Sequence, residues 1–354
     1  MTASSGPAAD PPSWVRGRVA DLYSSYVAAA ALAAAHELGL LEQIASTGSV
    51  PLMPGDQASR IDRAVLEAIW NALRWAGIVQ VRDGRAAAAG PQFADAYAAR
   101  GYFYWLVRGC GELFTEAPHL AQTANRDGTF YQRNMRAVAI GAQLIGENQA
   151  EELLQAVLAG LAPRRVADLG CGSGQRLIGL TSRDPAVRGV GIDISGDAVR
   201  LASENVASLG LSGRIIIRQA DARVLEPDPV LDDVDVVTCV FMGHDFWPFD
   251  DCVATLRRLR AALPAVRRLL LCDVTRAGTW HGPDTPIFTL GFELAHALMG
   301  VYVPTLEEWQ RAFAASGWAC EAVHDLAAPP NGHLFELRPD SQDGEGPRRC
   351  GASS

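Results

Sequence analysis

The chain has 354 residues, of which 49% are hydrophobic and 20% are charged, a composition typical of globular proteins. Its formal net charge of −9 argues against a nucleic-acid partner, because proteins that bind phosphates usually carry a basic face. No apolar run reaches the length of a membrane span, so no membrane partner is expected. The seven cysteines show no C-x-x-C spacing, which predicts reduced thiols in a cytoplasmic protein.

The two ends of the chain are polar and rich in small residues. Residues 1–13 contain "MTASSGPAADPP", which lacks the apolar core of a signal peptide. Residues 338–354 read "RPDSQDGEGPRRCGASS". Both compositions predict disordered tails.

Residues 14–92 combine helical sequence with a short hairpin. Alanine-rich helical sequence comes first, and "DRAVLEAIWNALRWAGIVQVRDGR" then predicts a helix that ends at Gly77 and a hairpin that turns at "RDGR". This order predicts a winged-helix-like dimerisation domain. The alternative is DNA binding, but residues 56–85 carry five basic and four acidic side chains, which leaves no basic stripe for phosphates.

The pattern changes after the aromatic stretch "GYFYWLVRGCGELF". We predict that residues 93–150, which contain this stretch, form a helical connector that contributes to a substrate pocket. Residues 151–337 alternate short apolar runs such as "RVADLG", "GVGIDI" and "RRLLLCDV" with helical stretches such as "DAVRLASENVASLG". This alternation predicts an α/β, Rossmann-like domain whose mostly parallel sheet is covered by helices on both faces.

The first strand of this domain leads into a glycine-rich turn, "VADLGCGSGQRLIGL". Gly170, Gly172 and Gly174 lie at G-x-G-x-G spacing, which lets the turn tighten and lets backbone N–H groups approach a ligand. The NAD-binding fingerprint is G-x-G-x-x-G, and this turn does not match it. Packing alone is the alternative explanation for these glycines.

Two acidic residues at strand ends strengthen the assignment of a nucleotide site. Asp193 ends the strand "GVGIDI", where a carboxylate can accept hydrogen bonds from ribose hydroxyls. Asp221 ends the strand "IIIRQAD", where the acid and the backbone of Ala222 can hold an adenine edge.

The turn D-L-G-C-G-S-G, followed by the two strand-end acids, resembles the class I S-adenosylmethionine (SAM)-dependent methyltransferases. The resemblance covers residues 150–337. It implies that Asp168 lies near the methionine part of SAM and that Phe241 and Met242 flank the cofactor. With the helical N-terminal part, the chain is similar to the small-molecule O-methyltransferases, and this similarity implies a homodimer.

The stretch "MGHDFWPF" follows the fourth strand and offers a first catalytic group. It resembles the segment of the O-methyltransferases in which a histidine followed by Asp-Trp removes a hydroxyl proton. This interpretation makes His244 the general base of a metal-free O-methyltransferase.

A second histidine, His296, supports a different reading. In "IFTLGFELAHALMG" it shares a helical face with Phe292 and Met299, so a buried structural histidine is one account. His244 and His296 nevertheless follow neighbouring strands, where two imidazoles can hold a metal ion. Asp245 would then be a third ligand or orient bound water, and His281 is the main rival ligand.

Four stretches together narrow the resemblance. They are "NRDGTFYQR", "MGHDFWP", "IFTLGFE" and "MGVYVPTLEEW", and they resemble the bacterial 2-oxo acid C-methyltransferases. Members of that family methylate the β-carbon of phenylpyruvate, indolepyruvate or branched 2-oxo acids, and so supply β-methyl amino acids for natural-product biosynthesis.

The family's metal-dependent mechanism carries over onto matching positions of this sequence. The resemblance implies that His244 and His296 hold one iron or zinc ion and that Arg126 faces the substrate carboxylate. The metal would stabilise the enolate, with Asp245 or metal-bound water as the base. Two alternatives stay open, the metal-free O-methyltransferase and a SAM-binding regulator that acts through the winged domain.

Overall fold

The structure divides the chain into two compact units. The computed structural model describes residues 15–53, 61–125, 133–146, 150–276, 278 and 282–340. Unit 1 contains residues 1–116 and 132–145, and unit 2 contains residues 117–131 and 146–354. The segment 93–150, expected as a connector, is therefore shared between the two units.

Unit 1 is mainly helical and carries one small sheet. Its helices are α1 (Arg18–Glu37), α2 (Leu40–Thr47), α3 (Arg63–Trp75), α4 (Phe93–Ala98), α5 (Arg100–Tyr104), α6 (Cys110–Thr115) and α8 (Met135–Gly146), with a π-helical turn at Trp105–Gly109. Its strands are β1 (Ser49–Pro51), β2 (Val79–Arg82) and β3 (Ala86–Ala89), which pair antiparallel in the order β1-β3-β2.

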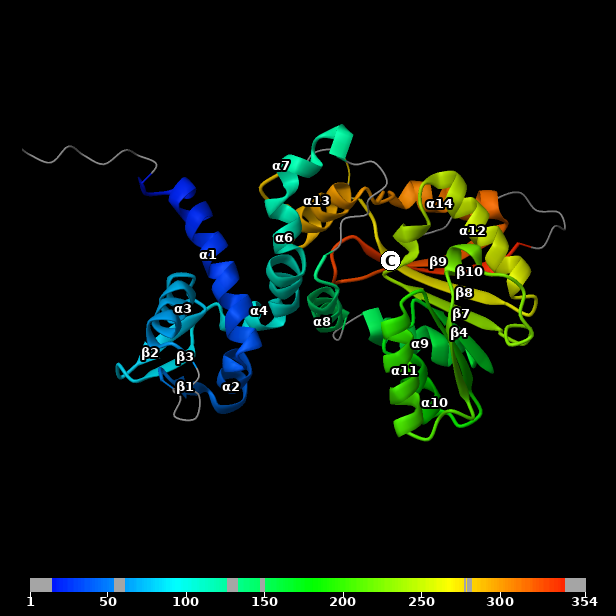
Figure 1. Cartoon of the computed structure of the whole chain (residues 1–354), viewed down its shortest axis with the longest axis horizontal. Helices are drawn as coiled ribbons and strands as arrows, with labels where there is room; N and C mark the ends of the chain where they lie inside the picture. Colours follow the sequence, from blue (N-terminus) through cyan, green and yellow to red (C-terminus); the bar gives the residue numbers. More distant parts are fainter. Residues whose placement is uncertain are drawn as a thin grey trace, which may run out of the picture. The chain divides into compact units, whose positions relative to one another are not determined.

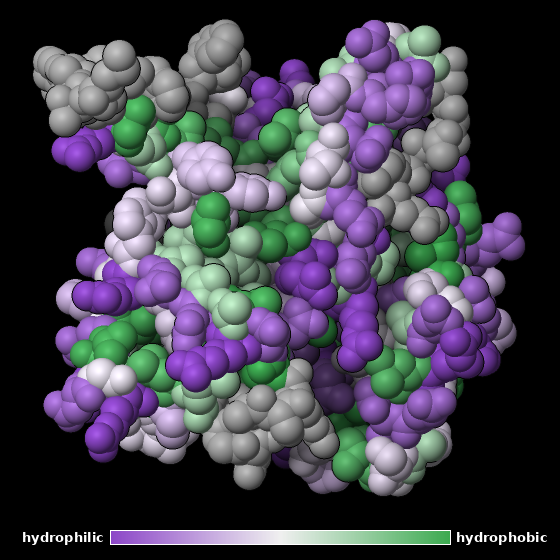
Figure 2. Space-filling view, turned by 60° about the vertical axis from the view of Figure 1, so that its left-hand side comes forward, coloured by the Kyte–Doolittle hydropathy of each residue, from purple (hydrophilic) through white to green (hydrophobic). Residues whose placement is uncertain are grey.

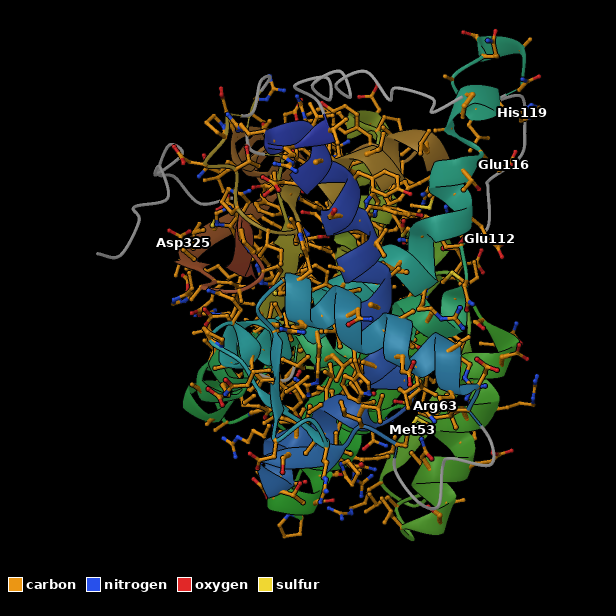
Figure 3. All side chains as sticks on the ribbon, turned by 90° about the vertical axis from the view of Figure 1, so that its left-hand side faces the viewer. Met53, Arg63, Glu112, Glu116, His119 and Asp325 are labelled. Carbon is orange, nitrogen blue, oxygen red and sulfur yellow. The ribbon has the colours of Figure 1, made fainter. Side chains whose placement is uncertain are left out.

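The helix and hairpin predicted around Gly77 are confirmed. Helix α3, which begins at Arg63 (Figure 3), buries Leu66, Trp70 and Leu73 at helical spacing against the core of unit 1. It ends at Trp75, before Gly77. The turn between β2 and β3 has positive φ at two successive positions, 51° and 63°, the geometry that tight hairpins favour.

Helix α1 leaves a row of large apolar side chains exposed. Val19, Leu22, Tyr23 and Tyr26 lie at i, i+3, i+4 and i+7 and are 62% to 76% exposed. The side of the molecule drawn in Figure 2 likewise shows apolar residues at the surface among hydrophilic ones. Such a row on one helix face suits contact with another protein surface.

No single described helix has both the length and the apolar composition needed to cross a membrane. Helices α1 and α2 meet both conditions together, as a pair bent by 73° at the break between them.

Unit 2 contains the large sheet and the helices that cover it. Its strands are β4 (Arg165–Leu169), β5 (Arg188–Asp193), β6 (Ile215–Gln219), β7 (Val236–Val240), β8 (Arg268–Val274), β9 (Trp318–Asp325) and β10 (Gly332–Pro339). Its helices are α7 (Ala117–Leu120), α9 (Ala150–Leu161), α10 (Gln175–Arg183), α11 (Gly196–Ser208), α12 (Phe249–Ala262), α13 (Thr289–Met299) and α14 (Leu306–Ser316). Short 3-10 turns lie at Thr123–Asn125, Ala222–Val224 and Gly243–Phe246.

The sheet has the strand order β6-β5-β4-β7-β8-β10-β9. The first five strands of this order are parallel, and β10 runs antiparallel to both β8 and β9. Helices α9, α10 and α11 pack on one face, and α12 and α14 pack on the other (Figure 1). The predicted α/β fold with a mostly parallel, doubly covered sheet is confirmed.

A carboxylate fixes the amino ends of the central strands. Asp235, just before β7, accepts hydrogen bonds from the backbone N–H groups of Arg164 and Arg165 at 2.9 to 3.2 Å. The side chain of Arg267, just before β8, donates to the same carboxylate at 3.2 Å. The amino ends of three neighbouring strands, β4, β7 and β8, are thus held in register. This also fixes the positions of their carboxyl ends.

Candidate functional site

The glycine-rich turn lies between β4 and α10. Gly170, Gly172 and Gly174 all have positive φ, of 69°, 53° and 78°, which explains why glycine is needed at each position. A side chain at Gly170 would also meet Met242, whose sulfur lies 3.4 Å from the position of a Cβ atom. The turn and the segment after β7 therefore pack directly against each other.

Asp193 ties this turn to the loop after β5. One carboxylate oxygen accepts the N–H of Gly172, and the other accepts the N–H of Ser195, both at 2.9 Å. A carboxylate has about four acceptor positions, so the side chain retains capacity for two hydroxyl donors. This geometry suits the expected role of Asp193 in binding ribose.

Asp168 supports the turn from below. It is fully buried, and its carboxylate accepts hydrogen bonds from Arg176 at 2.8 Å and from Thr238 at 2.7 Å. Arg176 also pairs with Glu151 at 3.1 Å. Burial alone lowers the pKa of Arg176, but the charges of Asp168 and Glu151 raise it above the usual value. Asp168 was expected beside the methionine of SAM, and its contacts show a carboxylate that anchors α10 under the glycine turn.

The residues expected to flank the cofactor follow β7. Phe241 has a φ of 54°, a conformation that costs a non-glycine residue roughly 1–2 kcal/mol. Its N–H donates to the carbonyl oxygen of Cys272 at 2.8 Å, which ties the end of β7 to β8. Met242 comes next and packs on Gly170. Backbone strain of this kind is common at functional sites.

His244 is held by a residue that the sequence reasoning missed. Asp273, the penultimate residue of β8, accepts the backbone N–H of His244 at 2.7 Å and contacts its ring Nδ1 at 2.8 Å. Both side chains are buried. The available signal was an acid at the end of the apolar run "RRLLLCDV", beside the strand that precedes His244.

His296 meets His244, as the strand order predicted. It is buried on the inner face of α13, and the two imidazole rings lie 4.8 Å apart between centroids, at 88°. Its Nδ1 contacts the carbonyl oxygen of Phe292 at 2.7 Å. Because a carbonyl oxygen only accepts, Nδ1 carries a proton, so the lone pair of the neutral form of the ring lies on Nε2.

The two histidines have the chemistry of metal ligands. Metal-binding histidines usually donate one ring N–H to a carboxylate or a carbonyl, which here are Asp273 and the carbonyl of Phe292. Within the described part of the chain, no third His, Cys, Asp or Glu completes a cluster that could hold a metal ion. Two imidazoles would supply only part of the ligands of a metal ion, and the others would have to be substrate or solvent oxygens.

Asp245 lies elsewhere. Its side chain is exposed and lines a cavity of about 230 Å³ together with Arg223, Asp251 and Arg258. The carboxylate that orients His244 is that of Asp273. Asp245 was considered from the sequence as a third metal ligand, as a group that orients bound water, or as the base. Arg126 and His281 lie outside the described residues.

Comparison with known proteins identifies the family. The family described as "Methyltransferase domain" matches residues 166–265. The chain is also 37% identical over 329 residues to "Methyltransferase ungE'" of Aspergillus campestris (strain IBT 28561), covering 90% of this chain and 96% of that protein. The chain belongs to the SAM-dependent methyltransferases. The methyltransferase has SAM as its cofactor, and its fold is that of the O-methyltransferase-like class.

Two further similarities bear on the methyltransferase. It is 34% identical over 212 residues to "Indolepyruvate C-methyltransferase" of Streptomyces griseus, which covers 59% of this chain and 62% of that protein. A solved structure of a putative O-methyltransferase from Nostoc punctiforme PCC 73102 matches with a TM-score of 0.66 at 16% identity, covering 91% of this chain and all of that one. The second similarity concerns the fold alone.

The bond between Asp273 and His244 yields a first prediction. The substitution Asp273→Asn removes the charge that orients His244, so we expect kcat for methyl transfer to fall by about 10–100-fold while SAM affinity stays unchanged. Steady-state kinetics and calorimetry measure the two quantities. The matched control is Asp325→Asn, since Asp325 (Figure 3) is an exposed carboxylate that contacts the ring of His333 at 2.8 Å. An Asp273→Asn enzyme with full kcat would contradict the role assigned to Asp273.

Proposed function

We propose that this methyltransferase transfers the methyl group of SAM to the β-carbon of a 2-oxo acid. Such a product is a precursor of β-methyl amino acids for natural products. The observation that carries the proposal is the meeting of two buried imidazoles, His244 and His296, each with Nδ1 engaged. His244 lies two residues after Met242, which packs on the glycine-rich turn. The similarity to an indolepyruvate C-methyltransferase supports the same substrate class.

The histidine pair would hold one metal ion, iron or zinc, through the two Nε2 atoms. When bound, this ion supplies Lewis acidity toward the keto and carboxylate oxygens of a 2-oxo acid. Asp273 keeps the ring of His244 in one orientation and one tautomer, and the carbonyl of Phe292 does the same for His296. By the family resemblance, Arg126 pairs with the carboxylate of the substrate.

The reaction requires that the β-carbon become a nucleophile. It loses a proton to a base, its electron pair forms a bond to the methyl carbon, and the methyl–sulfur bond breaks to release S-adenosylhomocysteine. Asp245 is exposed on the wall of the cavity that Arg223 and Asp251 also line, and no described contact joins its side chain to His244 or His296, so the proposal does not use it as the base.

A metal-free O-methyltransferase is the second candidate. The pair of Asp273 and His244 supports it, because a carboxylate on Nδ1 is the usual way to orient an imidazole that removes a proton from a hydroxyl group. This candidate gives His296 no part in the chemistry. The two functions therefore differ in their dependence on His296 and on metal.

An assay with purified enzyme, SAM and a panel of acceptors separates the candidates. The panel contains phenylpyruvate, indolepyruvate, 4-methyl-2-oxovalerate and simple phenols, and the readout is S-adenosylhomocysteine release. We expect turnover of a 2-oxo acid that falls by at least about 100-fold with a strong chelator or with His296→Ala, because both remove the Lewis acid. Turnover of a phenol that survives both treatments would establish the O-methyltransferase instead.

We also infer that the enzyme is a homodimer formed through the exposed apolar row of α1, Val19, Leu22, Tyr23 and Tyr26. Burying this row against a second copy would remove several large apolar side chains from water. The resemblance to O-methyltransferases, whose N-terminal domains dimerise, points to the same surface.

Charged substitutions on this row test the dimer. Because Leu22 and Tyr26 are each 74% exposed, the double variant Leu22→Glu/Tyr26→Glu should fold normally. It should be a monomer at concentrations where the wild type is a dimer, because the charges would be buried in the interface. Light scattering gives the mass, and circular dichroism checks the fold. Val81→Glu, on an exposed strand residue of the same unit, is the control and should stay dimeric. A wild-type protein that is monomeric at micromolar concentration would refute the inference.

A further inference from the structure

The end of β6 carries an arginine–carboxylate clasp. Asp221 caps the 3-10 turn Ala222–Val224, and its Oδ1 atom accepts the backbone N–H of Arg223 at 2.9 Å. The Arg223 side chain closes on the same carboxylate, with Nε 3.0 Å from Oδ1 and Nη2 2.8 Å from Oδ2. Both oxygens of Asp221 are therefore held by one neighbouring residue.

The clasp is anchored from behind. Ala222, between the two charged residues, is buried in the core that lies under α12. Arg258 of α12 donates a hydrogen bond to the carbonyl oxygen of Arg223 at 3.0 Å. The backbone of the turn is thus fixed, and the Asp221 side chain keeps about a quarter of its surface open to solvent.

The surrounding charges keep both partners ionised. Hydrogen bonding to Arg223 lowers the pKa of Asp221. The bond to Asp221 raises the pKa of Arg223, with smaller contributions from the charges of Asp245 and Asp251 across the cavity that these side chains line. An ionised carboxylate has acceptor positions only, so Asp221 offers the position that Arg223 leaves open, on Oδ2, to a donor and repels an acceptor.

We propose that Arg223 is a positioning residue for the adenine of SAM, because it aims the carboxylate of Asp221 at the amino group of the base. The strand order supports this, since β6 lies next to β5, whose end carries the ribose-binding candidate Asp193. The adenine ring attached to that ribose would reach the end of the neighbouring strand, β6. The proposal rests on SAM binding and on the assignment of Asp221, and it is independent of the methyl acceptor.

The clasp has a consequence for selectivity. The 6-amino group of adenine donates hydrogen bonds, whereas the 6-oxo group of hypoxanthine accepts them. A held, ionised carboxylate should therefore favour S-adenosylhomocysteine over S-inosylhomocysteine, and this preference should weaken when the carboxylate is released.

Calorimetry with these two ligands tests the role of Arg223. We expect the wild type to favour the adenosyl ligand by about 10–100-fold, the range for a hydrogen bond to a charged group. Arg223→Met should reduce that ratio by about tenfold, and Arg223→Lys should restore part of it because a lysine cannot hold both oxygens in the same way. The control is Arg165→Met, which breaks a similar pair with Asp233 at the opposite edge of the sheet.

The outcomes separate this role from a structural one. Equal weakening of both ligands in Arg223→Met, with the ratio unchanged, would show that the clasp only stabilises the turn and would overturn the proposal. A wild type that binds both ligands equally would overturn the placement of Asp221 at the base. Failure of the wild type to bind either ligand would overturn SAM binding itself, whereas tight binding without methylation of any 2-oxo acid would refute only the proposed reaction.

Discussion

The carboxylate of Asp273 is the interaction on which the catalytic arrangement depends. It accepts a hydrogen bond from the backbone N–H of His244 and contacts the ring Nδ1 of the same residue. The turn after β7 is therefore linked to the end of β8. The position of Asp273 follows from strand pairing, because β7 and β8 are parallel neighbours in a sheet held at its other edge by Asp235. His244 is thereby fixed, and His296 contacts it from the buried face of α13. The backbone N–H groups of His244 and Val274 satisfy the buried carboxylate oxygens of Asp273.

The same device recurs along the carboxyl edge of the sheet. Asp193 is the last residue of β5, Asp221 follows β6, and Asp273 is the penultimate residue of β8. Each accepts at least one backbone N–H group before any ligand arrives. Such carboxylates lose little freedom on binding, which favours affinity and orientation together. The glycines of the neighbouring turn contribute by having no side chain, since a side chain there would keep the backbone N–H groups away from the cofactor.

Much of this could be predicted from the sequence, for reasons that are local. The alternation of apolar runs and helices specified the sheet, the hairpin signal at "RDGR" specified the wing, and the strand order brought His244 and His296 together. Asp273 was missed because it looked like the last residue of a buried strand, and its partner is distant in sequence. The exposure of Asp245 could not be predicted, because His244 and Asp245 are consecutive in a 3-10 turn, which points adjacent side chains in different directions, one inward and one to solvent. Arg223 gave no signal, since an arginine two residues after an acid is ordinary on a surface.

The atom that receives the methyl group is the most direct test of the account. The enzyme would be incubated with SAM labelled with ¹³C in the methyl group and with the 2-oxo acid that it turns over best. The product would be examined by carbon–proton correlation NMR. The account predicts a labelled methyl group bonded to the β-carbon and coupled to a single β-proton. A labelled methyl group bonded to oxygen would contradict it and would assign His244, oriented by Asp273, to the removal of a hydroxyl proton.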